Sequence, residues 1–211
     1  MKLKYYFVFF VALGFLVFSV HCVALEVTKE QVLQSEKEMV RYRITKDTPR
    51  ESDEKLNRIL KRRIEEVRTG FLEIVSKGDT SLNIEYTLDI TYQRYVYEKY
   101  ISYCFIISTY TGGAHPNTTL FTIVYDTEKE EVVSLPEDAL EIISSSVRGD
   151  LLMNPRIVRT DFMMSGTEAR IENFQNFVFT KEGILFFFPP YQVGPYSSGM
   201  FSSVVPFEKL L

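Results

Sequence analysis

The clearest pattern in the chain is a strict two-residue alternation between positions 82 and 93. Apolar or aromatic residues occupy the even positions and polar residues the odd positions. Because successive side chains of a strand point to opposite faces, this alternation predicts a long strand with one buried face. Further strands are predicted at 100–109 and 118–125, with a short one at 132–135. One strand, or two, is expected within 26–46.

A second pattern, at helical spacing, predicts a long amphipathic helix at about 50–77. Thr48 is expected to cap this helix, with Pro49 at its first position and Glu51 completing a capping box. Gly78 supplies the stop. The polar face is rich in Lys and Arg, which favours a solvated face with ion pairs; contact with a membrane surface or a polyanion is the alternative. The apolar stripe consists of Leu56, Ile59, Leu60, Ile64, Val67, Phe71, Ile74 and Val75.

The second half of the chain combines a helix with further strands. A helix is predicted at about 136–152, opened by Pro136. A hairpin is predicted from 174–180 and 184–188, and a final strand near 203–207. Residues 154–170 are only weakly patterned, and we predict no regular element there.

This order of elements indicates the fold class. Runs of strands, then a helix, then strands again are typical of an α+β fold with antiparallel pairing. We expect two α+β subdomains, residues 25–119 and 120–211, packed as one unit.

The first 24 residues carry the features of a secretion signal. Two lysines precede an apolar run at 5–20 that is short for a membrane crossing, and small residues precede the expected cleavage after Ala24. We therefore expect an extracytoplasmic protein, either periplasmic or secreted. An uncleaved membrane anchor and lipid attachment at Cys22 are the alternatives.

Composition and charge narrow the choice of partner. The 211 residues are 45% apolar and 14% aromatic, which suits one compact domain or two small ones. Loss of Lys2 and Lys4 with the signal would change the formal net charge from −4 to −6. This balance excludes the basic surface that non-specific nucleic-acid binding needs. We expect no nucleic-acid partner, and membrane contact only through residues 1–24.

Few side chains are available for catalysis or metal binding. The histidines are His21 and His115, and the cysteines are Cys22 and Cys104. Cleavage would leave one of each, too few for an internal disulfide or an ordinary zinc site. Cys104 lies in an apolar run and is predicted to be a buried, unreactive strand residue. Since no cofactor or nucleophile motif occurs either, we expect no catalytic residue, no metal and no cofactor.

Two loops have a composition suited to binding. Paired glycines permit a positive φ or a close backbone approach, and prolines stiffen a loop that presents tyrosines. A stiff loop loses little entropy on binding, and a tyrosine offers both a flat apolar face and a hydroxyl. Alternatively, the glycines and prolines only turn the chain while the tyrosines pack beneath it. The candidate binding residues are Gly112, Gly113, His115, Pro116, Pro190, Tyr191, Pro195, Tyr196 and Gly199.

At these loops the chain resembles a known family. The segments YTGGAHPN at 110–117, FTIVYD at 121–126 and FTKEGI through PPYQVGPYSSG to VPF at 179–207 resemble the extracytoplasmic domain of RsiV-type anti-sigma factors. The same domain precedes the catalytic domain of PdaC-type peptidoglycan deacetylases. The resemblance covers roughly residues 27–211 and implies an α+β domain at the cell envelope. Some members bind lysozyme, which makes the proline- and tyrosine-rich loop the implied contact.

The resemblance has limits at both ends of the chain. Only four residues precede the apolar run, and the chain ends at Leu211 directly after the last family strand. We therefore expect neither the sigma-binding nor the deacetylase part. Many proteins of this architecture have no assigned role.

The leading hypothesis is a non-catalytic binding or sensing module of the bacterial cell envelope that recognises lysozyme or a cell-wall glycan. One alternative is a structural envelope component that assembles with itself or with a membrane partner. Another is a glycan hydrolase using carboxylates such as Glu168, Glu172 or Glu182, although no spacing pairs any two of them.

Overall fold

The computed structural model describes residues 27–30, 41–79, 81, 83–157 and 160–210. The predicted signal at 1–24, with Cys22 and His21, lies outside these residues. No helix in the described ranges is long and apolar enough to cross a membrane.

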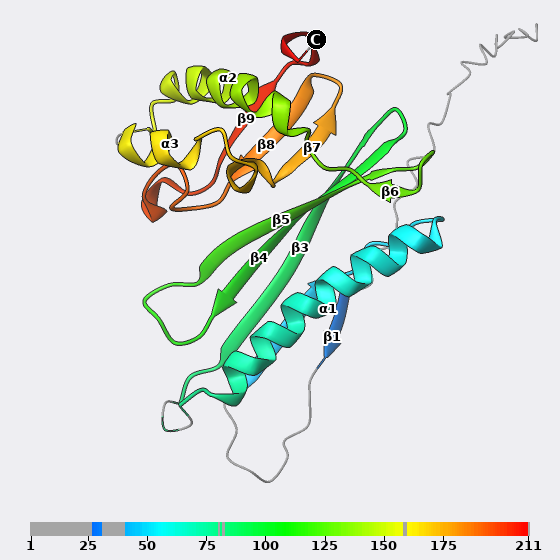
Figure 1. The fold of residues 1–211 in the computed structure, drawn as a ribbon. Helices are drawn as coiled ribbons and strands as arrows, with labels where there is room; N and C mark the ends of the chain where they lie inside the picture. The colour runs from blue at the N-terminus through cyan, green and yellow to red at the C-terminus, as the bar shows by residue number, and fades with distance from the viewer. Residues whose placement is uncertain (1–26, 31–40, 80, 82, 158–159, 211) are drawn as a thin grey trace, which may run out of the picture.

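The first half of the chain builds a six-stranded sheet whose spatial order follows the sequence (Figure 1). The long alternating segment predicted at 82–93 forms β3, shifted toward the C-terminus. The predicted strand at 132–135 shortens to the two residues of β6. The strands are β1 (Val27–Glu30), β2 (Tyr42–Asp47), β3 (Tyr86–Tyr97), β4 (Tyr100–Tyr110), β5 (Asn117–Asp126) and β6 (Glu131–Val132).

One pair of neighbours in this sheet departs from the antiparallel pairing expected from the sequence. β2 and β3 are parallel, with Ile44 opposite Leu88, whereas the other neighbours are antiparallel. The helix α1 (Glu54–Ser76) connects them. Such a crossover brings the chain back to the end of the sheet at which β2 began, so β3 runs in the same direction as β2.

The start of α1 corrects the predicted capping box. The N-cap is Asp53, whose carboxylate accepts the backbone N–H groups of Lys55 at 2.7 Å and Leu56 at 2.9 Å. Glu51 instead forms an ion pair with Arg94 on β3, at 2.5 Å. A carboxylate that accepts two helix N–H groups is a strong cap, so the helix begins at Glu54 rather than near residue 50.

The second half of the chain builds a smaller layer. β7 (Phe177–Thr180), β8 (Gly183–Phe188) and β9 (Phe201–Val205) form an antiparallel sheet in that order. The connecting segments contain short 3-10 helices: η1 (Glu137–Ala139), η2 (Ile171–Phe174), η3 (Tyr196–Ser198) and η4 (Phe207–Lys209). Two helices accompany this sheet, α2 (Leu140–Leu152) and the unpredicted α3 (Thr160–Gly166).

The two sheets meet edge to face. The N–H of Phe177 on β7 donates to Thr122 Oγ1 on β5 at 3.0 Å, and that of Phe179 reaches Ser102 Oγ on β4 at 3.5 Å. Hydroxyls on the face of the first sheet thus satisfy the edge of the second, which would otherwise carry unpaired backbone groups.

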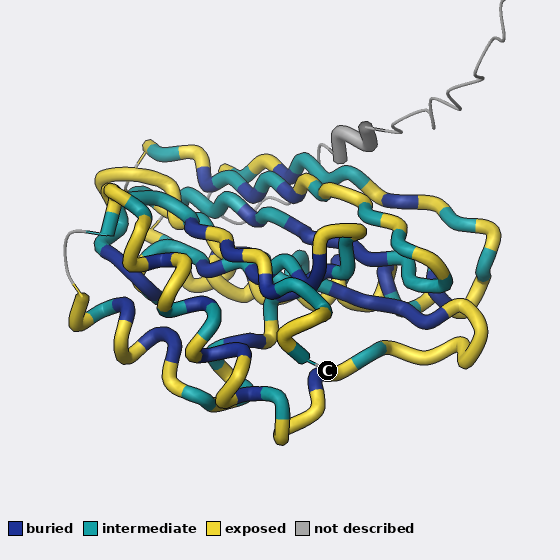
Figure 2. Tube along the Cα trace, turned by 90° about the horizontal axis from the view of Figure 1, so that it is seen from above, coloured by how far each residue is buried: buried dark blue, intermediate teal, exposed yellow. Residues whose placement is uncertain are grey.

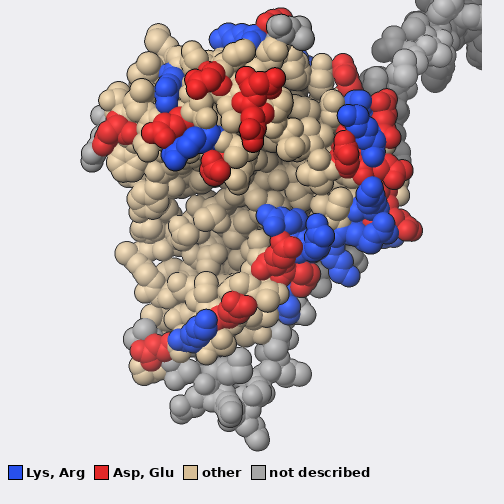
Figure 3. All heavy atoms as spheres, viewed as in Figure 1, with Lys and Arg blue, Asp and Glu red and all other residues tan. Residues whose placement is uncertain are grey.

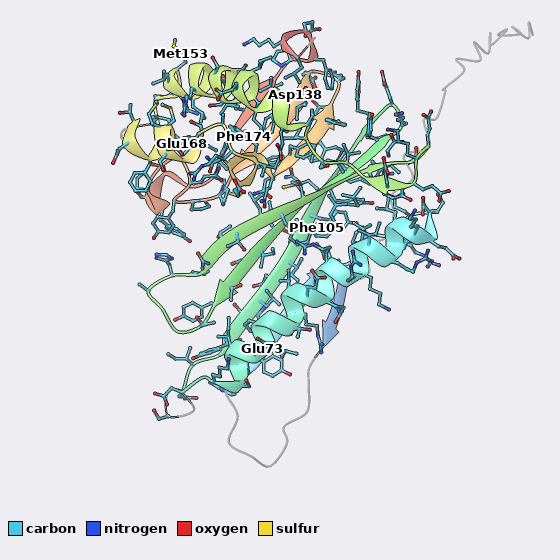
Figure 4. All side chains as sticks on the ribbon, in the orientation of Figure 1. Glu73, Phe105, Asp138, Met153, Glu168 and Phe174 are labelled. Atoms are coloured by element: carbon cyan, nitrogen blue, oxygen red, sulfur yellow. The ribbon has the colours of Figure 1, made fainter. Side chains whose placement is uncertain are left out.

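Two hydrophobic clusters fill the layers. The first lies between α1 and the first sheet and includes Phe105, and the second lies between α2 and the second sheet and includes Phe174 (Figure 4). Figure 2 shows buried positions running along the strands while exposed positions follow the outer helix faces. The mixed α+β class predicted from the sequence is confirmed. The division expected after residue 119 falls inside β5, and the organisation as two subdomains packed as one unit stays a prediction.

Candidate functional site

The two loops selected from the sequence meet at one end of the molecule, between β4 and β5 and between β8 and β9 (Figure 1). The rings of His115 and Tyr196 are stacked, with centroids 4.1 Å apart and planes 19° apart. Tyr191 adds a third ring, tilted by 39° and 5.6 Å from that of Tyr196. We call these three residues the aromatic stack. It joins side chains that lie some eighty positions apart in the sequence.

Hydrogen bonds to one carbonyl reinforce the stack. The hydroxyl of Tyr196 donates to the carbonyl oxygen of Pro116 at 2.5 Å. His115 Nδ1 lies 2.9 Å from the same oxygen. The second loop is therefore fastened to the backbone of the first, and the ring faces keep a fixed direction.

Hydrogen bonds in both directions join the 189–200 loop to the α2–α3 layer behind it. Gln192 Nε2 donates to the carbonyls of Gly166 at 2.9 Å and Asn173 at 2.8 Å. Arg156 donates from Nη1 to the carbonyls of Ser198 at 3.2 Å and Met200 at 3.3 Å. The bonds from Arg156 take the place of water on the loop carbonyls, and those from Gln192 fix the loop to its neighbours. The loop is therefore ordered before any ligand binds.

Close packing adds to these hydrogen bonds. The side chain of Val193 is fully buried. A Cβ added to Gly166 would come 1.9 Å from the carbonyl oxygen of Gln192, so only glycine permits this approach of α3 to the loop. The guanidinium of Arg156 lies over the ring of Phe201, 4.4 Å from its centroid.

The backbone of Tyr191 is strained. Its φ of +73° lies in the left-handed region, although its side chain is bulky. The ring is 57% exposed, so burial of the ring does not explain the conformation. Strained residues of this kind cluster at ligand clamps and functional sites, where the surroundings hold them in place.

The glycines divide into two groups. Gly112 and Gly199 have positive φ values of +91° and +70°, as their place in tight turns requires. Gly113 has no positive φ and faces no close neighbour other than the carbonyl of His115, at 3.8 Å. Of the paired glycines, only Gly112 needs its conformational freedom.

The remaining predicted site residues frame the stack. Pro116 contributes the shared carbonyl, whereas Pro190 and Pro195 are half-buried and precede Tyr191 and Tyr196 in the chain. The structure therefore brings together the rings of His115, Tyr191 and Tyr196, with the prolines and glycines shaping the chain around them.

Charge is distributed unevenly around the molecule. In Figure 3, charged side chains gather along α1 and over the α2–α3 layer, while much of the surface between them is uncharged. The aromatic stack contains no acidic or basic side chain apart from the imidazole of His115. What it offers a ligand is flat ring faces and hydroxyls rather than charge.

The side chains considered for catalysis lie elsewhere. Cys104 is buried in β4 as predicted, and burial raises the pKa of its thiol to about 11. Glu168 pairs with Arg170 at 3.0 Å, and Glu182 lies 3.5 Å from Lys181 on the β7–β8 turn. Within the described ranges, no three His, Cys, Asp or Glu residues gather in a group that could hold a metal ion.

Sequence reasoning missed the residues that support the loop. Arg156 and Gly166 fall in or beside the weakly patterned stretch where no element was predicted, and Gln192 gives no signal beyond its place between two prolines. Their partners are backbone carbonyls, which any sequence provides. Only the three-dimensional approach of α3 to the loop identifies them.

A comparison with known protein families finds a match for the second half of the chain. Residues 131–208 match the family described as "Protein of unknown function (DUF3298)". The match contains the 189–200 loop and the whole β7–β9 sheet, but not α1 or the His115 loop. No curated protein matches the chain.

Solved structures of DUF3298 proteins extend the likeness to nearly the whole chain. A family protein from Pseudomonas aeruginosa is similar with a TM-score of 0.65 and 18% identity, over 89% of this chain and 90% of that chain. A member from Bacteroides fragilis is similar with a TM-score of 0.59 and 17% identity, over 89% and 92% of the two chains. At these identities the likeness is one of fold.

Proposed function

We propose that this protein is a non-catalytic, extracytoplasmic binding or sensing module of the bacterial cell envelope, and that the aromatic stack recognises lysozyme or a cell-wall glycan. The observation that carries the proposal is the contact between His115, Tyr196 and Tyr191, which unites the two loops chosen from the sequence.

The chemistry of the stack suits such ligands. Flat ring faces pack against the apolar faces of sugars or against side chains in an enzyme cleft, and phenol hydroxyls add hydrogen bonds. Because Gln192 and Arg156 already order the loop, binding costs little further entropy. The strained backbone of Tyr191 is a second reason to assign function to this loop.

Location and charge support the choice of partner. The apolar run at 5–20 indicates export, and the resemblance to RsiV-type and PdaC-type domains points to the cell envelope. A net charge of −6 after cleavage would speed the encounter with a basic enzyme such as lysozyme.

Calorimetric titration of the purified protein tests the proposal, with lysozyme in one series and soluble peptidoglycan fragments in another. We expect one of the two to bind with a dissociation constant below about 1 mM. The double variant Tyr191→Ala/Tyr196→Ala should weaken that binding at least about tenfold, since it removes two exposed aromatic contacts.

A matched control separates the site from the general surface. Met153 is 84% exposed at the end of α2 and points away from the molecule (Figure 4), so Met153→Ala should leave binding unchanged. The proposal fails if neither ligand binds, or if the double variant binds as well as the Met153→Ala variant.

A further inference from the structure

The β7–β9 sheet has one open edge. Its strand order places β9 at the outside, and β7 at the opposite edge is already covered by Ser102 and Thr122 of the first sheet. An uncovered edge strand presents a row of backbone groups to which another strand can pair.

The ladder identifies which backbone groups face outward. Phe187 donates its N–H to Asn176 on the β7 side, so the alternate residues of β8 pair with β9, and Phe186 lies opposite Ser203. By the same alternation, the N–H and C=O groups of Ser202 and Val204 point away from β8. Among the described residues, no hydrogen bond is seen to these four groups.

A groove runs along this edge, with β9 as one wall and α2 as the other. Figure 1 shows β9 between β8 and α2. The groove has a volume of about 750 Å³. Its wall on α2 includes Ile142, Ser145, Ser146 and Gly149, and its opposite wall includes Val204. The small residues leave room for side chains, and the exposed Ile142 and Val204 offer apolar contacts.

The charges of the groove define its occupant. Glu141 and Asp150 line it, while the amine of Lys209 lies 3.0 Å from Ser146 Oγ. Figure 3 shows further acidic side chains gathered over the α2–α3 layer. A second copy of this chain would bring the same acidic groove against itself. A segment with lysine or arginine is attracted instead.

From these observations we propose a second binding surface, separate from the aromatic stack and independent of the function assigned to it. The edge of β9 binds an extended, basic peptide segment of another protein as a fourth strand, in the groove beside α2. Backbone hydrogen bonds to Ser202 and Val204 hold the segment. Its alternate apolar side chains enter the groove beside Ile142, and the others lie on the opposite face of the sheet, beside Val204. Pro206, which has no N–H, ends the pairing edge.

Two glycines provide a matched pair of variants. A Cβ added to Gly149 in α2, or to Gly70 in α1, would meet no atom within 4 Å. Leucine is a better helix former than glycine, so Gly149→Leu and Gly70→Leu should both fold at least as stably as the natural chain. Gly149→Leu fills the groove, whereas Gly70→Leu leaves it open.

The experiment titrates the full-length, isotope-labelled protein with a capped Lys-Val-Lys-Val-Lys-Val-Lys peptide and follows the backbone amides by NMR. We expect saturable binding and slowed hydrogen exchange at the amides of Ser202 and Val204. The same peptide with every amide N-methylated keeps its charge but cannot donate backbone hydrogen bonds, so it should bind at least about tenfold more weakly. Gly149→Leu should weaken binding by a similar factor, and Gly70→Leu should leave it unchanged.

Several results would overturn the proposal. The first is an absence of saturable binding by the unmodified peptide. The second is equal binding of the N-methylated peptide, which would reduce the interaction to charge alone. The third is unchanged binding by Gly149→Leu. Finally, protection of the Ser202 and Val204 amides without peptide, together with a dimer mass in ultracentrifugation, would assign this edge to a second copy of the chain.

Discussion

Two groups of aromatic side chains in this protein serve different purposes. The first is buried between α1 and the sheet, where Phe105 stacks on Phe121 with centroids 4.7 Å apart and contacts Tyr103. The second is the aromatic stack of His115, Tyr196 and Tyr191 at the surface. Ring geometry is similar in both, so geometry alone does not separate a core cluster from a surface cluster.

The partners of the hydroxyl groups make the distinction. Tyr103 donates to the carboxylate of Glu51, and Tyr125 donates to that of Asp53 at 2.9 Å, so both buried phenols fix the start of α1. Tyr196 donates to a loop carbonyl, and its ring face stays half-exposed. The buried group therefore joins α1 to the sheet, while the stack fastens one surface loop to another.

The largest expected effect comes from truncating the buried group. Phe105 is fully buried, and Phe105→Ala should lower the free energy of unfolding by about 3–5 kcal/mol through the cavity it leaves. Tyr196→Ala should cost about 1 kcal/mol or less, the value of one exposed hydrogen bond and one ring contact. Urea unfolding of both variants measures the difference, and equal losses would contradict the distinction.

The next effect concerns the cap of α1. Asp53→Ala should cost about 2–3 kcal/mol of unfolding free energy, because two helix N–H groups and the buried hydroxyl of Tyr125 lose their acceptor. Thr48→Ala serves as the control, since the exposed Thr48 lies outside the helix and should have almost no effect. A larger loss at Thr48 would restore the capping box predicted from the sequence.

A comparison at Tyr191 isolates backbone strain. Tyr191→Gly relieves the positive φ, whereas Tyr191→Ala keeps it. The glycine variant should therefore be more stable than the alanine variant by about 1 kcal/mol, although both lose the ring. Thermal unfolding of both variants at one pH measures the difference. An alanine variant of equal or greater stability would show that the backbone at this position is not strained.

The smallest effect near neutral pH comes from the buried phenols. Burial and the hydrogen bond to Asp53 raise the pKa of Tyr125 from 10.0 to about 12, and burial with the bond to Glu51 raises that of Tyr103 further. A folded-state pKa above the unfolded one means that this stabilisation is complete below pH 10 and is lost as the pH rises toward 12. Unfolding measured across this range should show the decline.

A matched variant assigns the decline to its source. Tyr125→Phe should reduce the slope of the pH dependence between pH 10 and 12, and the contribution of Tyr103 should remain. An equal slope in the natural chain and in Tyr125→Phe would show that other groups cause the decline.

Much of the fold follows from patterns in the sequence. The alternation in β3 and the apolar stripe of α1 depend on local periodicity, which survives in the structure because each buries one face. The parallel pairing of β2 with β3 and the edge-to-face contact through Ser102 and Thr122 depend on long-range approach, and no local pattern encodes them.

The same division applies to the candidate site. The composition of the two loops selected His115, Tyr191 and Tyr196, because a stiff loop that presents aromatic rings loses little entropy on binding. That these rings contact one another, and that Arg156 and Gln192 tie their loop to the α2–α3 layer, required the structure. The capping prediction failed because four acidic or hydroxyl residues lie close together at 48–53, and Glu51 instead contacts Arg94 and Tyr103.

The most direct test of the central claim maps the binding surface itself. Backbone NMR spectra of the labelled protein, recorded during titration with unlabelled lysozyme and separately with peptidoglycan fragments, report which residues meet the ligand. The account predicts that the largest shifts fall in residues 112–116 and 190–199 and disappear in Tyr191→Ala/Tyr196→Ala. Largest shifts on α1 or in the groove beside β9, with both loops unchanged, would contradict it.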